Sequence, residues 1–210
     1  MAAILANLAG IYCSEGKCTE ADQLFARALV IDEQALGPNH PAVAEVLNDE
    51  AGAFEREHQH DKAVQSYQRA LMIRKEVFGP NHLLVAQSEY GLGMAYLSKK
   101  DYNAAEPLFS NALDIREKAL GPDHPLVADA LQGLAHIYVV RKLYREAESA
   151  YVRSLAIERA AYGQIHPAVA VTLDSYAALL RLLKRGAEAD LLAARAMVVR
   201  AKYNERNPPG

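Results

Sequence analysis

Apolar residues recur along the chain with the spacing of one face of an α-helix. In the first stretch they fall at positions i, i+3, i+4 and i+7, namely Leu5, Leu8, Ala9 and Tyr12. A second stretch follows a short polar break and alternates small with large apolar residues, at Ala21, Phe25, Ala28 and Leu29. Two amphipathic helices are therefore predicted within the first 36 residues.

The same pair of patterns returns every 42 residues. In the later copies of the second helix, small residues stand before and after a central position that is aromatic in three copies and alanine in the last. These groups are Ala63-Tyr67-Ala70, Ala105-Phe109-Ala112, Ala147-Tyr151-Ser154 and Ala189-Ala193-Ala196. Small residues let two helix axes approach closely, and the larger side chain fills the groove between them. Because the pattern continues to the end of the 210 residues, we predict ten packed helices.

Glycine and proline mark the ends of these helices. Each second helix is expected to end at a glycine that can adopt a left-handed conformation, at Gly37, Gly79, Gly121 and Gly163. A proline then begins the next first helix in three units, at Pro41, Pro125 and Pro167. The predicted fold class is all-α, with five helix-turn-helix units stacked as an α-solenoid of ten antiparallel helices.

We expect a single solenoid domain over residues 1–203, with repeats at about 2–43, 44–85, 86–127, 128–169 and 170–203. Residues 204–210 are expected to form a disordered tail.

Composition and charge exclude several classes. The net charge of −3 argues against a nucleic-acid partner, and no apolar run approaches the roughly 20 residues that span a bilayer. The start lacks the basic segment of a signal peptide. Cys13 and Cys18 do not make a disulfide scaffold, so a reducing, cytoplasmic location is expected. The two thiols flank the first turn, where helix packing is favoured over a redox role.

The repeat resembles the tetratricopeptide repeat. It has Leu-x-x-Leu-Ala-x-x-Tyr in the first helix and Ala-x-x-x-Phe/Tyr-x-x-Ala in the second. The 42-residue period, with RAL-x-I followed by LGP-x-HP-x-VA, is similar to that of kinesin light chain and of many bacterial proteins. The resemblance covers nearly the whole chain, and it implies a right-handed solenoid that serves as a scaffold for protein partners.

Enzyme signatures are missing from the sequence. There is no GxSxG, no Walker A loop, no GxGxxG after a strand and no HExxH. The chain is therefore predicted to be no enzyme, with no catalytic residue, no cofactor and no metal.

A histidine recurs at each junction between units, at His40, His82, His124 and His166. Zinc ligands lie about 2.0–2.1 Å from the ion, whereas neighbouring helix axes are about 8–10 Å apart. One histidine per unit cannot converge on one ion, so each is expected to cap the next helix or to pack on its neighbour.

His58 and His60 form a tighter group with Glu55 and Asp61. This group has the chemistry to bind adventitious metal, but a polar turn between helices is the favoured interpretation.

The resemblance implies that the first helix of each unit lines a concave inner face. The side chains expected to bind a peptide there are Glu45, Asn48, Asp49, Gln87, Tyr90, Met94, Leu97, Asp129, Gln132, His136, Val139, Asp174 and Arg181.

This face is acidic in the second, fourth and fifth units and amphipathic in the middle. Such a groove suits an extended or helical peptide with an apolar anchor and neutral or basic flanks. We expect Asn48 and Gln132 to hydrogen-bond the partner's backbone. Kinesin light chains commonly carry paired asparagines on this face, and only Asn7 and Asn48 match. The two-lysine, two-asparagine carboxylate clamp of other tetratricopeptide domains has no counterpart.

Two glutamates stand where other units have leucine or tyrosine. Glu50 and Glu89 fall at packing positions, and an unpaired buried carboxylate is costly. They are expected either to tilt to solvent or to pair with a cation such as Lys62 or Arg56.

The terminal helices keep apolar residues without polar capping helices. This favours an alternative function, in which the chain is a fragment or a self-associating module that assembles into homo-oligomers through its end faces. Neither function involves nucleic acid or membrane.

Overall fold

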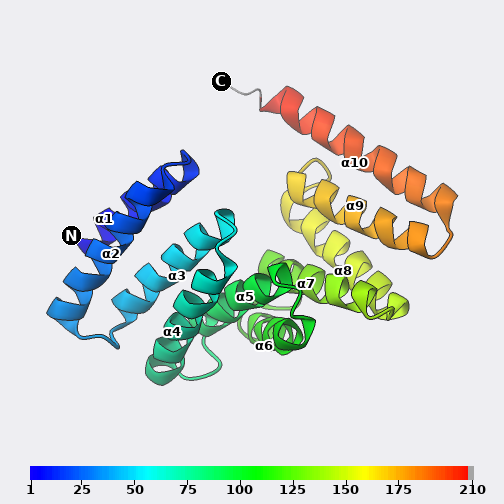
Figure 1. Cartoon of the computed structure of the whole chain (residues 1–210). Coiled ribbons are helices and arrows are strands. Elements are labelled where there is room, and N and C mark those ends of the chain that lie inside the picture. The colour runs from blue at the N-terminus through cyan, green and yellow to red at the C-terminus, as the bar shows by residue number, and fades with distance from the viewer. Residues whose placement is uncertain (208–210) are drawn as a thin grey trace. The chain divides into compact units, whose positions relative to one another are not determined.

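The computed structural model describes residues 1–207, and these form ten α-helices and no strand (Figure 1). The helices are α1 Ala2–Ser14, α2 Cys18–Leu36, α3 Pro41–Arg56, α4 His60–Phe78, α5 Leu83–Ser98, α6 Tyr102–Leu120, α7 Pro125–Val140, α8 Tyr144–Tyr162, α9 Pro167–Leu182 and α10 Gly186–Arg206. The predicted all-α solenoid of helix pairs is confirmed.

The chain divides into two compact units, and the division falls inside α6. Unit 1 covers Met1–Ile115, and unit 2 covers the chain from Arg116 onward. The expectation of one domain over residues 1–203 stays a prediction.

The helix starts differ from the expected repeat boundaries. The first helices of the later pairs begin at 41, 83, 125 and 167, three residues before the boundaries at 44, 86, 128 and 170. The helices begin at the junction, as predicted for Pro41, Pro125 and Pro167, whereas the repeat boundaries follow the apolar pattern, which becomes visible only one turn later.

The C-terminal boundary is also corrected. Residues 204–206, expected in a disordered tail, form the end of α10. No glycine or proline interrupts the sequence between Gly186 and Pro208, so nothing stops the helix earlier. The remainder of the expected tail, 208–210, lies outside the described residues.

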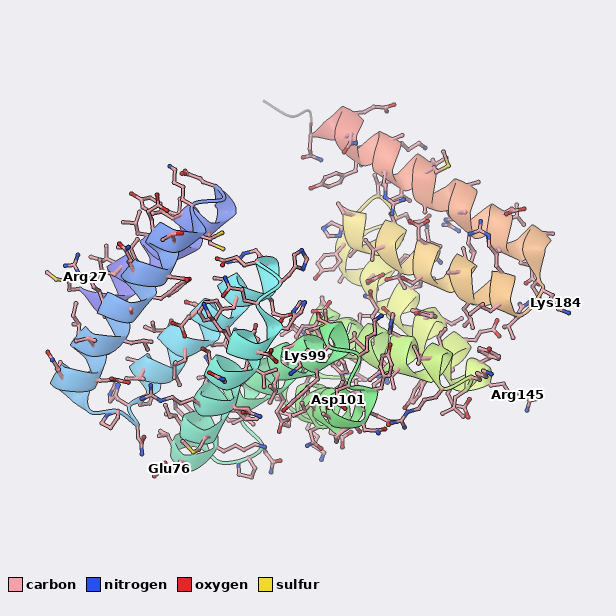
Figure 2. All side chains as sticks on the ribbon, in the orientation of Figure 1. Arg27, Glu76, Lys99, Asp101, Arg145 and Lys184 are labelled. Atoms are coloured by element: carbon pink, nitrogen blue, oxygen red, sulfur yellow. The ribbon has the colours of Figure 1, made fainter. Side chains whose placement is uncertain are left out.

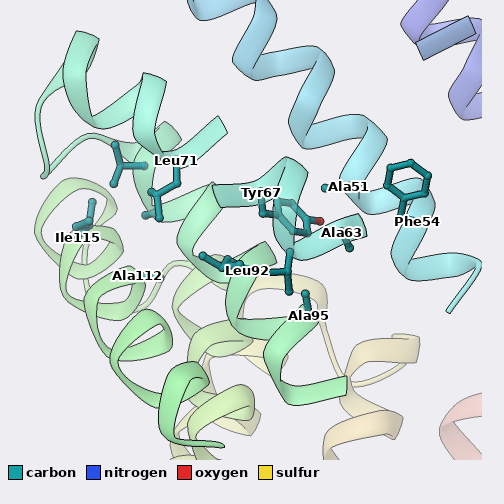
Figure 3. Packing of buried hydrophobic residues seen from close by; sticks show 12 residues of the cluster. Ala51, Phe54, Ala63, Tyr67, Leu71, Leu92, Ala95, Ala112 and Ile115 are labelled. Carbon is teal, nitrogen blue, oxygen red and sulfur yellow. The ribbon is translucent and has the colours of Figure 1, made fainter. Parts of the chain in front are cut away.

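The core of unit 1 is centred on Tyr67, whose ring lies among small side chains of neighbouring helices (Figure 3). Ala51, Ala63 and Ala95 are fully buried around it. Gly91 on α5 makes this packing possible, because a Cβ there would lie 2.4 Å from Tyr67 Cε1. The predicted role of small residues at helix crossings is therefore realised here by a glycine as well as by alanines.

Unit 2 has its own core between α8, α9 and α10. Leu155, Val169, Leu173, Ala196 and Val199 are buried together. Each unit thus buries an apolar interior that joins one helix pair to the next.

The two unexpected glutamates have different environments. Glu89 is 2% exposed, and its Oε1 lies 2.7 Å from Lys75 Nζ. Glu50 is half-buried and accepts a hydrogen bond of 2.6 Å from Ser66 Oγ. Burial, together with the Asp22 charge, raises the pKa of Glu50, whereas the Ser66 hydrogen bond and the Arg69 and Lys62 charges lower it.

None of the helices in the described part of the chain combines the length and the apolar character that a bilayer span requires.

Candidate functional site

The histidine of each junction caps the helix that follows. The Nδ1 atom of His40, His82, His124 and His166 accepts the backbone N–H two residues later, at N···N distances of 3.1–3.3 Å. This satisfies one of the N–H groups that the first turn of a helix leaves without a partner. The capping prediction is confirmed, and the row of histidines is a structural joint.

The histidine pair at the second turn is part of a polar network. His60 Nδ1 lies 2.8 Å from Glu55 Oε1, and the rings of His58 and His60 meet edge to face at 5.9 Å. Asp61 instead pairs with Lys99 of the next turn at 2.5 Å. These contacts fit the predicted polar turn.

In unit 1 most of the expected inner-face side chains are accessible. Glu45 and Asp49 on α3 are exposed, as are Gln87 and Met94 on α5. Leu97 and Tyr90 are half-buried, and the Tyr90 ring meets Phe109 edge to face with centroids 5.7 Å apart.

Asn48 does not fit its expected role. Its side chain is only 9% exposed, and Oδ1 lies 3.1 Å from Arg74 Nη1 and 3.2 Å from Ser88 Oγ. This carbonyl oxygen serves the fold, so Asn48 contributes to the inner face mainly by holding neighbouring helices in place.

A cavity of about 290 Å³ opens on this face of unit 1. Its walls come from α1, with Ala6, Asn7 and Gly10, and from α3, with Asn48, Asp49, Gly52 and Arg56. The aromatic rings of Phe25 and Tyr67 complete the lining. Gly10 and Gly52 both line the cavity, and a Cβ at Gly10 would meet no atom within 4 Å, so the absence of a side chain there helps to keep the space open.

The lining of the cavity combines an acidic side chain, Asp49, a basic side chain, Arg56, and the hydroxyl group of Tyr67. Although Asp49 as a whole is exposed, partial desolvation of its carboxyl group in the cavity, and then the nearby Glu45 charge, raise its pKa, while Arg74 and Arg56 oppose this. Burial raises the pKa of Tyr67 to about 12, so its hydroxyl remains a hydrogen-bond donor at neutral pH. The site offers an acceptor, a cation and a hydroxyl group around one opening.

Arg74 on α4 supports this arrangement and was missed from the sequence. It is 3% exposed, and its Nη1 lies 2.8 Å from Ser88 Oγ and 3.0 Å from the Leu84 carbonyl oxygen. Arg116 occupies the same place 42 residues later and donates to the Leu126 carbonyl oxygen at 2.6 Å. The recurrence of arginine at this spacing was the signal available in the sequence.

Unit 2 places glutamate at the next equivalent position. Glu158 is 2% exposed, and its Oε1 accepts from Gln132 Nε2 at 2.8 Å and from Thr172 Oγ1 at 3.0 Å. Burial raises the pKa of Glu158, and these two hydrogen bonds oppose the shift. Gln132, like Asn48, is therefore engaged within the protein.

The remaining inner-face residues of unit 2 are more dispersed. Asp129 and Val139 are half-buried, and His136 is exposed. Asp174 forms an ion pair with Arg200, and Arg181 pairs with Asp190 at 3.3 Å. The expected apolar middle, shared by α5 and α7, belongs to both units and stays a prediction.

A group of possible metal ligands lies at the turn between α1 and α2 in unit 1. Ligand atoms of Cys13, Cys18 and Glu57 all lie within 4.8 Å of one another. A hydrogen bond to Glu57, with burial second, raises the pKa of Cys18 to about 11. Sequence reasoning missed this group because Glu57 is remote from both cysteines along the chain.

A family model of the tetratricopeptide repeat matches residues 1–76, 51–118 and 84–157. The chain belongs to the tetratricopeptide repeat family. This family consists generally of non-enzymatic scaffolds for protein partners, in agreement with the sequence analysis. A search of curated protein sequences found no match.

Solved structures share the fold of this tetratricopeptide repeat chain. BtubC (BKLC) from P. vanneervenii is 24% identical, with a TM-score of 0.83 over 98% of this chain and 82% of that one. A Podospora anserina putative kinesin light chain with nearly identical repeats is 22% identical, with a TM-score of 0.77 over 94% of both chains. The apo form of RapI is 14% identical, with a TM-score of 0.82 over 97% of this chain and 72% of its own. The expected likeness to kinesin light chain repeats is confirmed.

Proposed function

We propose that this tetratricopeptide repeat chain is a scaffold that binds a peptide segment of a partner protein on the face formed by its first helices. The cavity between α1 and α3 carries the proposal, because it combines a defined volume with charged and aromatic lining. Binding sites of this kind bury an anchoring side chain and use a few polar groups to fix its orientation.

The chemistry of the cavity defines the partner segment. Asp49 and Glu45 favour a neutral or basic flank, while the Phe25 and Tyr67 rings favour an apolar anchor. Arg56 offers a donor to a backbone carbonyl or a polar side chain of the peptide. Gln87 and Met94 on α5 extend the surface along which the peptide would continue.

Selection of peptides from a displayed library tests the proposal, followed by fluorescence-anisotropy titration of the peptides selected. A Gly10→Leu substitution fills the cavity without meeting any neighbouring atom within 4 Å of its Cβ, so the fold should persist while binding is lost. Gly186→Leu is the matched control, because Gly186 also has open space around it.

Charge reversal supplies a second comparison. Asp49→Lys should weaken binding of basic peptides at least tenfold. Glu76→Lys makes the same change at an exposed position on α4 (labelled in Figure 2) and should leave binding unchanged. Equal effects of the two reversals, or unaltered binding by the Gly10→Leu protein, would contradict the proposed site.

Self-association is a second candidate function, favoured by an apolar surface on α10. Leu191, Met197 and Val198 are 71%, 69% and 51% exposed, and Leu191 and Val198 lie two turns apart on one helix face. Light scattering over a range of concentrations tests it. Leu191→Glu should abolish any dimer, whereas Val152→Glu, at an exposed apolar position on α8, should not. A monomer at every concentration would rule out this candidate.

A further inference from the structure

Three metal-ligating side chains converge at the first turn of unit 1. Cys13 lies in the last turn of α1, Cys18 is the first residue of α2, and Glu57 is the C-terminal cap residue of α3. Their Sγ and carboxylate oxygen atoms lie within 4.8 Å of one another, and Cys13 Sγ is 3.9 Å from Glu57 Oε1. We propose that Cys13, Cys18 and Glu57 bind a zinc-type divalent cation that links the first helix pair to the second.

The distances suit a tetrahedral ion. Zinc–sulfur bonds of about 2.3 Å place two thiolates about 3.8 Å apart around one zinc ion. The side chains of Cys13 and Cys18 therefore need to approach by no more than about 1 Å to reach this geometry. Rotation about their χ1 bonds supplies such a movement, and Glu57 is already close to Cys13.

The ligand set selects the class of metal. Two thiolates favour zinc and other soft or borderline cations over magnesium or calcium, which prefer oxygen ligands. Three protein ligands leave the fourth tetrahedral position to a water molecule.

Asp22 lies on α2, one turn after Cys18, and is close enough to Glu57 for the two carboxylates to interact electrostatically. Its Oδ1 atom is buried and has no hydrogen-bond partner among the described residues. A metal-bound water would provide that partner, since carboxylates commonly accept hydrogen bonds from the ligands of bound metals. The orphaned oxygen is thus a second observation that points to a ligand at this place.

The consequence for the fold is a cross-link between repeats. Cys13 and Cys18 belong to the first helix pair and Glu57 to the second, so the metal would tie α1 and α2 to α3. Arg56, which lines the peptide cavity, directly precedes Glu57. Metal binding would therefore stabilise one wall of the cavity, although the metal site does not depend on the proposed peptide function.

The test uses the full chain, stripped of metal and kept reduced with a phosphine. Titration with Cd²⁺ should give one ion per chain and a thiolate-to-metal charge-transfer band in the ultraviolet. Zn²⁺ should compete for the same site and raise the thermal midpoint. Cys18→Ser should remove both the band and the Zn²⁺-dependent shift, and Glu57→Gln should weaken binding at least tenfold.

Two controls separate this site from its surroundings. Glu15→Gln neutralises an exposed carboxylate of the same turn, and His58→Asn removes a nearby imidazole while keeping a residue that tolerates the left-handed conformation found there. Both should bind Cd²⁺ as the wild type does. Absence of the charge-transfer band, retention of binding by Cys18→Ser, or loss of binding in His58→Asn would overturn the proposal.

Discussion

The capping histidines allow one prediction to be worked out in detail, because two of them differ in a single contact. His82 and His124 both accept the N–H two residues later, at 3.1 and 3.2 Å. The His82 ring also stacks on Phe78, with centroids 4.7 Å apart and an angle of 20° between the planes. Leu120 occupies the place of Phe78 before His124 and offers no ring.

The two contacts set the expected magnitudes. Removing a side-chain N-cap costs about 1 kcal/mol, so His124→Ala should lower the free energy of unfolding by about that amount. His82→Ala should cost about 0.5–1.5 kcal/mol more, because the ring pair is lost as well. Phe78 and His82 are both exposed, which places the stacking contribution near the lower end of this range.

Replacement by asparagine separates the two effects. Asparagine restores a capping acceptor at both positions, so His124→Asn should be close to wild type and His82→Asn should retain only the stacking loss. Urea unfolding gives the free energies, and amide hydrogen exchange at Leu84 and Leu126 reports each cap directly. Unchanged exchange at Leu126 in the His124→Ala protein, or no rescue by asparagine, would refute the capping interpretation.

Three further predictions concern the packing and the buried network. Gly91→Ala should destabilise unit 1 by about 1–3 kcal/mol through the clash with Tyr67. Gly52→Ala is the control: its Cβ would lie 3.7 Å from the Tyr67 hydroxyl, so it should be neutral or stabilise by up to about 1 kcal/mol. Equal thermal midpoints of the two variants would contradict the close approach of Gly91 to the Tyr67 ring. Arg74→Met should cost about 2–4 kcal/mol, because acceptors on α3 and α5 lose a charged donor; a loss below about 0.5 kcal/mol in urea unfolding would show that the network contributes little. Burial raises the pKa of Glu158, so the folded state holds this proton more tightly than the unfolded state does. The stabilisation of the folded state by this bound proton is fully present below the pKa of Glu158 in the unfolded chain. It is lost as the pH rises through the higher pKa of Glu158 in the folded protein. Glu158→Gln should therefore be more stable than wild type at pH 7 by on the order of 1 kcal/mol, with the difference vanishing near about pH 4; a pH-independent difference would contradict this cause.

The helices themselves were predictable because local signals agree with one another. The apolar period, the glycine stops and the junction prolines all place each helix within a few residues of its observed bounds. Capping by His40 and its equivalents followed from their position at the junction. The helix starts at Pro41, Pro125 and Pro167 followed from the junction prolines, whereas the repeat boundaries were set three residues too late because the apolar face begins after the cap.

Side-chain partners across helices were less accessible to sequence reasoning. Asn48 was expected to face a partner, but its carbonyl oxygen lies against Arg74, 26 residues away. For Glu89 the sequence leaves solvent exposure and pairing as alternatives, and its partner in the structure is Lys75, which the sequence does not single out. These pairings depend on how one helix is rotated against the next, which an apolar period alone does not specify.

Arg74 and Glu158 occupy equivalent places but have opposite hydrogen-bonding needs. The guanidinium can only donate, and finds acceptors such as the Leu84 carbonyl oxygen. The Glu158 carboxylate can only accept when ionised, and depends on the hydroxyl of Thr172. Exchanging the helix pair that carries Arg74 for the pair that carries Glu158 would place a donor opposite a donor or an acceptor opposite an acceptor. The buried polar residues thus make the repeats non-interchangeable, and shuffling their order should fail even though their apolar faces are nearly alike.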